Sequence, residues 1–179
     1  MNFKSLSLSF ILLLSVLVQS CAQKSIPTDK PMCSNPEFDQ TITKMLSFST
    51  PLISVEELKN IQNDVFIFDA RKREEYEVSH IKGARYVGYD DFDEARLEGI
   101  SKDAKIVVYC SIGYRSEKIG DKLQKLGYSR VSNLYGSIFE WINQGFEVVN
   151  LAEEPIKKVH TYNSKWSQWL NNDAVEKVW

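Results

Sequence analysis

The residue best suited to chemistry in this chain is Cys110, which directly follows the apolar run 105–109. The next five residues lead towards a predicted helix, and successive N–H groups ahead of a helix N-terminus form a concavity that binds anions. Such a helix end, with an arginine nearby, lowers the pKa of a cysteine and favours the nucleophilic thiolate. The pattern therefore predicts a reactive thiolate at Cys110.

The loop after Cys110 contains residue types that suit a cradle around a sulfur atom. Gly113 is able to take the positive φ that a tight loop commonly demands. Arg115 is able to hold loop or substrate oxygens through forked hydrogen bonds, and Ser116 is predicted as the N-cap of the helix. The residues expected to line the cradle are Ser111, Ile112, Gly113, Tyr114 and Ser116.

The cysteine loop and two other segments together resemble the rhodanese family. Residues 110–116 read CSIGYRS and match the family's CxxGxRS active loop. Upstream, the family's D-x-R, E-[FY] and G-H-I-P-G-A elements are similar to Asp69-Ala70-Arg71, Glu74-Glu75-Tyr76 and His80 to Ala84. Its closing G-G-x-x-x-W-x-x-x-G segment resembles Gly136, Trp141 and Gly145. The resemblance spans about residues 50 to 150, and its departures (Ser79, Lys82 and Ser137) leave the cysteine loop intact.

This resemblance implies a two-step sulfur transfer. Cys110 would take a sulfane sulfur from a small donor such as thiosulfate, hold it as a persulfide, and pass it to a thiol or cyanide acceptor. No cofactor and no metal is implied, because loop amides suffice to stabilise the persulfide anion. Asp69 and Arg71 would buttress the site, and Arg71 would also attract an anionic donor.

Several alternatives remain open on the sequence alone. Cys110 could be an inert buried residue, and Asp69 and Arg71 could form a structural ion pair without a catalytic part. A cysteine phosphatase or arsenate reductase is disfavoured, because only four residues separate Cys110 from Arg115 and Tyr109 stands where a phosphatase has histidine. A sulfur carrier that does not turn over, or a protein-docking rhodanese module, is the main rival to an enzyme.

The segments around Cys110 predict an α/β fold. The runs 65–68, 84–89, 105–109 and 131–134 are predicted strands, and helices are expected from Ser54 to about residue 60, over 116–126 and from Gly136 to about residue 144. Such alternation indicates one domain with a parallel sheet covered by helices on both faces. Since function lies at the carboxyl ends of parallel strands, Asp69 and Cys110 are expected at the same edge.

The N-terminus is typical of an exported lipoprotein. Residues 1–20 form a predicted signal peptide, with Lys4 before an apolar run that is too short for a spanning helix. The following LVQSC resembles a bacterial lipobox, which implies lipid on Cys21, membrane attachment, a location in the bacterial cell envelope facing the periplasm, and access to a redox partner there. An ordinary cleaved signal is the alternative.

The remaining segments complete the expected domain plan. Residues 21–50 are predicted as a flexible tether, 51–150 as the rhodanese-like domain, and 151–179 as an aromatic tail with a short helix. Whether Cys33 in the tether pairs with Cys110 is left open. A formal net charge of −2, without a basic run, argues against nucleic acid as a partner.

Overall fold

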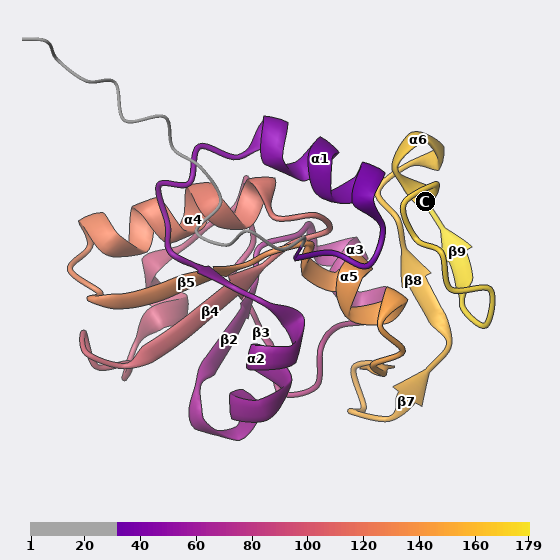
Figure 1. Ribbon diagram of the computed structural model, residues 1–179. Helices are drawn as coiled ribbons and strands as arrows, with labels where there is room; N and C mark the ends of the chain where they lie inside the picture. Colours follow the sequence, from indigo (N-terminus) through magenta and orange to yellow (C-terminus); the bar gives the residue numbers. More distant parts are fainter. Residues whose placement is uncertain (1–31) are drawn as a thin grey trace, which may run out of the picture.

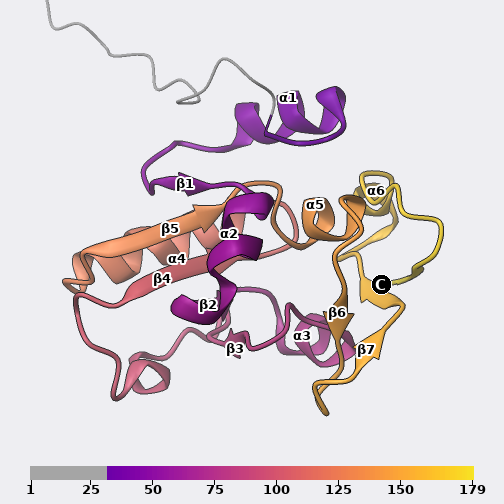
Figure 2. The ribbon, with the colours of Figure 1, turned by 60° about the horizontal axis from the view of Figure 1, so that its bottom comes forward.

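The computed structural model describes residues 32–179, and its centre is a five-stranded sheet in which every pair of neighbouring strands is parallel (Figures 1 and 2). The strand order is β1-β5-β4-β2-β3, so β4 is central and its carboxyl end lies between β5 and β2. The predicted α/β class with a parallel sheet is confirmed. The strands are β1 (Leu52–Ile53), β2 (Phe66–Asp69), β3 (Arg85–Tyr86), β4 (Lys105–Tyr109) and β5 (Arg130–Leu134).

Helices cover both faces of this sheet because side chains alternate along each strand. In β4, Ile106 and Val108 pack with Ile119 and Leu123 of α4, whereas Val107 belongs to a second apolar cluster shared with α2 and α5. The strand residues that β4 contributes to both clusters are buried, as expected for a parallel sheet inside a domain. The helices are α2 (Val55–Ile61), α3 (Arg73–Val78), α4 (Tyr114–Lys125) and α5 (Ser137–Asn143), with short 3₁₀ turns at Gln62–Asp64 and Glu94–Leu97.

The predicted helix starts are right for α2 and two residues late for α4. At α2, the Ser54 hydroxyl accepts from the Glu57 backbone and the Glu57 carboxylate accepts from the Ser54 backbone, a complete capping box. At α4 the N-cap is Gly113 with a φ of 116°, and Ser116 already lies inside the helix. Ser116 is therefore not the N-cap, because the helix begins after Gly113, three residues earlier.

Residues 32–50 correct the prediction of a flexible tether. They contain the helix α1 (Pro36–Met45), which begins at Asn35, whose side chain caps the N–H groups of Glu37 and Phe38. Phe38 and Ile42 are four residues apart, lie on one helix face and are fully buried against the domain. The polar composition of this segment concealed its short apolar stripe, which finds its partners only in the folded domain.

The C-terminal segment contains the predicted short helix, α6 (Ser164–Ser167), together with strands that pair locally. It is fixed by the buried side chains of Val159 and Leu170, and the Trp169 ring stacks on Phe38 of α1 at a centroid distance of 5.6 Å. Helix α1 and the C-terminal segment thus meet beside the domain (Figure 1). The additional strands are β6 (Val148–Val149), β7 (Pro155–Ile156), β8 (Lys158–His160) and β9 (Glu176–Val178).

The predicted signal peptide and Cys21 lie outside the described residues. Within residues 32–179, no helix combines the length and the apolar character needed to cross a membrane.

Candidate active site

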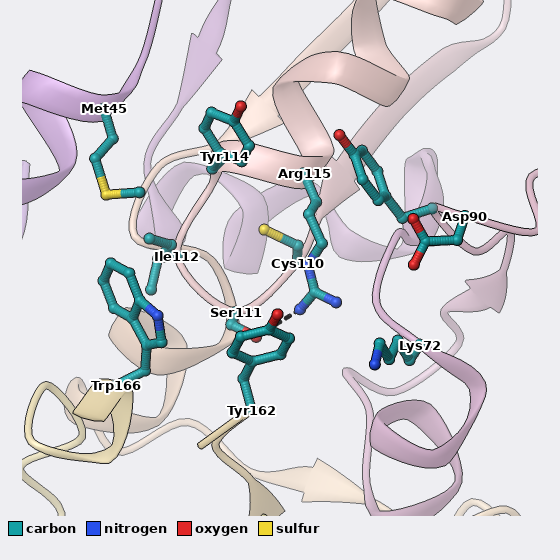
Figure 3. A pocket seen from close by; sticks show the side chains of 11 residues that line it. Met45, Lys72, Asp90, Cys110, Ser111, Ile112, Tyr114, Arg115, Tyr162 and Trp166 are labelled. Carbon is teal, nitrogen blue, oxygen red and sulfur yellow. Dashed lines mark hydrogen bonds between the residues drawn. The ribbon is translucent and has the colours of Figure 1, made fainter. Parts of the chain in front are cut away.

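Cys110 lies directly after β4, at the carboxyl edge of the central strand, and is completely buried. Its backbone N–H donates to Ser137 Oγ at 3.1 Å, and its carbonyl oxygen accepts from the Ile138 N–H at 3.2 Å, so the start of α5 holds it in place. The side chain lines a cavity of about 260 Å³ (Figure 3). Asp69 ends the neighbouring strand β2 at the same edge, as expected from the topology.

The loop after Cys110 folds back on the sulfur. The Gly113 N–H donates to Cys110 Sγ at 3.1 Å, which requires the left-handed backbone that Gly113 adopts. Asn133 on β5 fixes this turn, because its side-chain amide donates to the Gly113 carbonyl at 3.0 Å and its oxygen accepts from Ser116 Oγ at 2.6 Å. The loop therefore closes on the sulfur through the Gly113 N–H, and Asn133 of β5 holds this turn in place.

The environment favours the thiolate of Cys110. Burial alone raises the pKa of this thiol, but the positive charge of Arg115 and hydrogen bonds from Ser116 and Gly113 oppose burial and leave the pKa below its ordinary value. These stabilising groups come from one loop and the first turn of α4, where the helix dipole also favours negative charge.

Arg115 is held by Glu75, a residue of α3. The guanidinium and carboxylate form a forked pair, with Nη1 to Oε2 at 2.6 Å and Nη2 to Oε1 at 2.8 Å. Ser111 completes the network, since its hydroxyl donates to Glu75 Oε1 and accepts from Arg115 Nη2. Burial raises the pKa of Glu75, but its hydrogen bonds and ion pair with Arg115 outweigh burial and lower that pKa to about 2.

Asp69 and Arg71 form a second ion pair that lies beneath the site. Arg71 Nη2 is 2.6 Å from Asp69 Oδ2 and also donates to the Ser79 carbonyl at 2.6 Å, and both side chains are fully buried. Neither residue is among those that line the cavity. The structure thus brings Arg115, and not Arg71, to the cavity beside the Cys110 sulfur. The Asp69–Arg71 pair joins β2 to the turn before β3.

Residues beyond the predicted set complete the site. Glu75 lies in the segment that resembles the family's E-[FY] element, and that resemblance could have pointed to it. The sequence analysis gave Glu75 no part in the site. Met45, Tyr162 and Trp166 line the cavity, and no sequence pattern pointed to them. The full lining is Met45, Lys72, Tyr89, Asp90, Cys110, Ser111, Ile112, Tyr114, Arg115, Tyr162 and Trp166.

Cys33 is a free thiol in a different environment. It is buried with its Sγ close to Gly136, and burial followed by the carboxylates of Glu140 and Asp39 raises its pKa. Cys110 is also a free thiol, so the two cysteines are not joined. The environments of these two buried thiols therefore shift their pKa values in opposite directions, down for Cys110 and up for Cys33.

The part of the chain that contains Cys110 and Arg115 is similar to known proteins. A family model described as "Rhodanese-like domain" matches residues 54–144. Curated relatives include the tRNA uridine(34) hydroxylases of Escherichia fergusonii and Escherichia coli, 28% and 33% identical over 117 residues. Each match covers 63% of this chain and 33% of the relative, so the chain spans about a third of the length of these relatives.

Solved structures show the same fold. The solution structure of a rhodanese-like domain from Anabaena has a TM-score of 0.53 at 24% identity, over 57% of this chain and 81% of that one. A thiosulfate sulfurtransferase from Pseudomonas aeruginosa has a TM-score of 0.52 at 23% identity, over 56% of this chain and 20% of that one.

The Glu75–Arg115 pair predicts a defined pH dependence of stability. The folded-state pKa of Glu75, about 2, is below its ordinary value of 4.5, so its stabilisation is present above pH 4.5 and is lost as pH falls towards 2. Glu75→Gln should lower the free energy of unfolding by about 3 kcal/mol at pH 7 and by progressively less below pH 4.5. Urea denaturation of both proteins across this range measures the difference.

The matched control is Glu77→Gln, an exposed glutamate of the same helix that lies 3.8 Å from Arg73. It should change stability little at any pH, because exposed ion pairs contribute little. A difference between wild type and Glu75→Gln that stays constant from pH 7 to pH 2 would contradict the role of the ionised carboxylate.

Proposed function

We propose that this chain, which belongs to the Rhodanese-like domain family, is a sulfurtransferase that carries a sulfane sulfur as a persulfide on Cys110. The observation that carries the proposal is the Cys110 thiol itself. It lies on a cavity, its pKa is lowered by Arg115 and by loop hydrogen bonds, and the Gly113 N–H points at its sulfur.

In the first step, the Cys110 thiolate attacks the outer sulfur of a donor such as thiosulfate. A new S–S bond forms to Cys110 Sγ, the donor's S–S bond breaks, and sulfite leaves with the electron pair of that bond. The negative charge then lies on the terminal sulfur of the persulfide. The groups that stabilise the thiolate, the Gly113 amide and the Arg115 guanidinium, are placed to stabilise this anion as well.

In the second step, a thiolate or cyanide attacks the terminal sulfur of the persulfide. The bond between the two sulfurs breaks, the acceptor keeps the sulfane sulfur, and Cys110 returns as a thiolate. Step one adds a sulfane sulfur to Cys110 and step two removes it, so the complete cycle leaves the oxidation state of Cys110 unchanged and needs no redox cofactor. A carrier that is loaded but does not turn over would perform only the first step, and this is the second candidate.

Each residue of the site has its own role in this proposed cycle. Cys110 is the nucleophile, Arg115 supplies positive charge near it, and Gly113 and Ser116 supply the hydrogen bonds to its sulfur. Glu75 is a positioning residue, because it acts through Arg115 and Ser111. We assign the Asp69–Arg71 pair a structural part, since both residues are buried and absent from the cavity wall.

We further propose that the chain is attached to the bacterial envelope through lipid on Cys21 and faces the periplasm. The support is the sequence alone: a positive flank, a short apolar run, and LVQSC directly before a polar segment. Several acyl chains on one residue hold a soluble domain firmly at a membrane.

Replacing Cys110 by serine should abolish sulfur transfer and leave the fold intact, because serine is nearly isosteric but forms no persulfide. Intact-mass analysis after incubation with thiosulfate should show wild-type protein gaining one sulfur and losing it again on addition of cyanide or glutathione. The serine variant should gain none. Sulfur that loads and never leaves would favour the carrier, and undiminished thiosulfate sulfurtransferase activity of the serine variant would exclude the proposed nucleophile.

Arg115→Ala should slow loading of Cys110 by about tenfold at neutral pH, because the thiolate loses the nearby positive charge that lowers its pKa. The difference in loading rate between the variant and wild type should shrink as pH rises. At a pH above the raised pKa, the Cys110 thiol of the variant is ionised as well. Stopped-flow rates of persulfide formation from pH 6 to 10 test this. Arg115→Lys, which keeps the charge, should restore part of the rate.

Two variants serve as controls for Arg115→Ala. Arg130→Ala removes an exposed arginine at the start of β5, and Cys33→Ser removes the other described thiol. Both should load sulfur at the wild-type rate under reducing conditions. Equal losses in all three variants would argue that the effect of Arg115→Ala reflects general damage to the protein.

Cys21→Ala should prevent lipid attachment while leaving the folded domain active. Wild-type protein expressed in a bacterium should incorporate labelled palmitate and fractionate with membranes, and the variant should do neither. A wild-type protein that takes up no label and appears wholly in the soluble periplasmic fraction would replace the lipobox with an ordinary cleaved signal.

A further inference from the structure

The wall of the Cys110 cavity is built mainly from apolar and aromatic side chains. Six of the eleven lining residues are of this kind, and four of them are aromatic. In Figure 3, Met45, Ile112 and Trp166 lie on one side of the Cys110 sulfur, and the Tyr162 ring lies beside Arg115, with its centroid 5.2 Å from the guanidinium carbon. The six are Met45, Tyr89, Ile112, Tyr114, Tyr162 and Trp166.

Half of this apolar wall comes from outside the segment that matches the family model. Met45 ends α1, and Tyr162 and Trp166 belong to the C-terminal segment, whereas the family match covers residues 54–144. These flanking segments are fixed in place: Trp169 stacks on Phe38, and its carbonyl accepts from the Asn143 side chain of α5. The packing of Trp169 therefore fixes the C-terminal segment that carries Tyr162 and Trp166 at the cavity.

The charges around the cavity do not favour a dianion. The one positive charge of Arg115 is shared between the Glu75 carboxylate and the Cys110 thiolate, and the other two charged lining residues, Lys72 and Asp90, have opposite signs. The Cys110 thiolate adds one further negative charge. Thiosulfate carries two negative charges that would lose water on entry, and such a loss is unfavourable without compensating cations.

Access to the sulfur passes along this wall. Cys110 itself has no exposed surface, and it borders the cavity together with the aromatic residues. A donor must therefore lose its hydration water against these apolar and aromatic side chains before its outer sulfur reaches Cys110 Sγ. Burial of an apolar group against such rings is favourable, whereas burial of an uncompensated charge is not.

We infer, on the basis of the proposed sulfur transfer, that the compound that loads Cys110 is an organic sulfane-sulfur donor with an aromatic or similar apolar group and at most one negative charge, in preference to inorganic thiosulfate. The apolar group packs against Tyr162, Trp166 and Met45, while the outer sulfur meets Cys110. The lack of excess positive charge at the cavity and its apolar wall both favour an organic donor with an apolar group and at most one negative charge.

The loading step balances for such a donor as it does for thiosulfate. For a persulfide R–S–SH, the Cys110 thiolate forms a bond to the outer sulfur, the S–S bond of the donor breaks, and the thiolate R–S⁻ leaves. For a thiosulfonate R–SO₂–S⁻, the same attack releases the sulfinate R–SO₂⁻ and leaves the negative charge on the persulfide. No external oxidant or reductant takes part in either case.

Three stable donors separate the effect of the ring from the effect of charge. Benzenethiosulfonate and methanethiosulfonate each carry one negative charge and differ in the ring, whereas thiosulfate is a small dianion. Single-turnover rates of persulfide formation on the full chain are measured by intact mass, and each rate is divided by the rate of the same donor with a free small thiol. We expect benzenethiosulfonate to load roughly tenfold faster than methanethiosulfonate, and thiosulfate to load slowest.

Variants of the wall then test which side chains select the ring. Tyr162→Ala, a half-exposed position, and Trp166→Ala should each remove most of the preference for benzenethiosulfonate over methanethiosulfonate. The matched control is Trp179→Ala, because Trp179 is exposed in the same C-terminal segment but does not line the cavity. It should keep the wild-type preference.

The outcomes distinguish this inference from the proposed function. If no donor adds sulfur to Cys110, the sulfurtransferase proposal fails. If all three donors load Cys110 but thiosulfate is fastest, or the two thiosulfonates load equally, sulfur transfer stands and the organic donor is excluded. If the preference for benzenethiosulfonate survives both Tyr162→Ala and Trp166→Ala, and each variant keeps the wild-type melting temperature, the C-terminal segment is excluded as the source of the preference.

Discussion

The carboxylate of Glu75 accepts hydrogen bonds from Arg115, from the Ser111 hydroxyl and from the Lys72 backbone, and these partners come from different elements of the site. It thereby joins α3 to the cysteine loop and to the first turn of α4. Because the carboxylate is buried, each lost partner would leave a polar group without water. The orientation of Arg115, and through it the stabilisation of the Cys110 thiolate, depends on this one ionised side chain.

The groups that contact the Cys110 sulfur and much of the cavity wall come from different parts of the chain. The donors that stabilise the sulfur lie in the loop and helix that follow β4, inside the segment that matches the family model. Much of the wall that a substrate would meet is supplied by α1 and the C-terminal segment, outside that match. A fold can thus keep its nucleophile while its flanking segments change what reaches it, which is why fold membership alone does not assign a substrate.

The flanking segments are held by buried polar contacts as well as by apolar packing. Glu117 of α4 is buried and accepts from the backbone N–H groups of Ser47 and Ser49, which fixes the chain between α1 and β1. Glu140 of α5 accepts from the backbone of Ser34 at 2.7 Å. Carboxylates on core helices therefore anchor the N-terminal segment, and this anchoring places Met45 at the cavity.

The sequence by itself determined the α/β class, the order of β2 to β5 with α2, α4 and α5, the loop around Cys110 and the meeting of Asp69 and Cys110 at one sheet edge, because apolar periodicity, capping residues and a contiguous loop are local features. It did not indicate the short elements β1 and α3. It did not determine that residues 32–50 are ordered, that Arg71 is buried beneath the site, or that Tyr162 and Trp166 form part of its wall. These depend on contacts between residues far apart in the chain, such as Phe38 with Trp169. Only the tertiary structure decides such contacts, since the burial that stabilises them exists only once the separate elements have packed together.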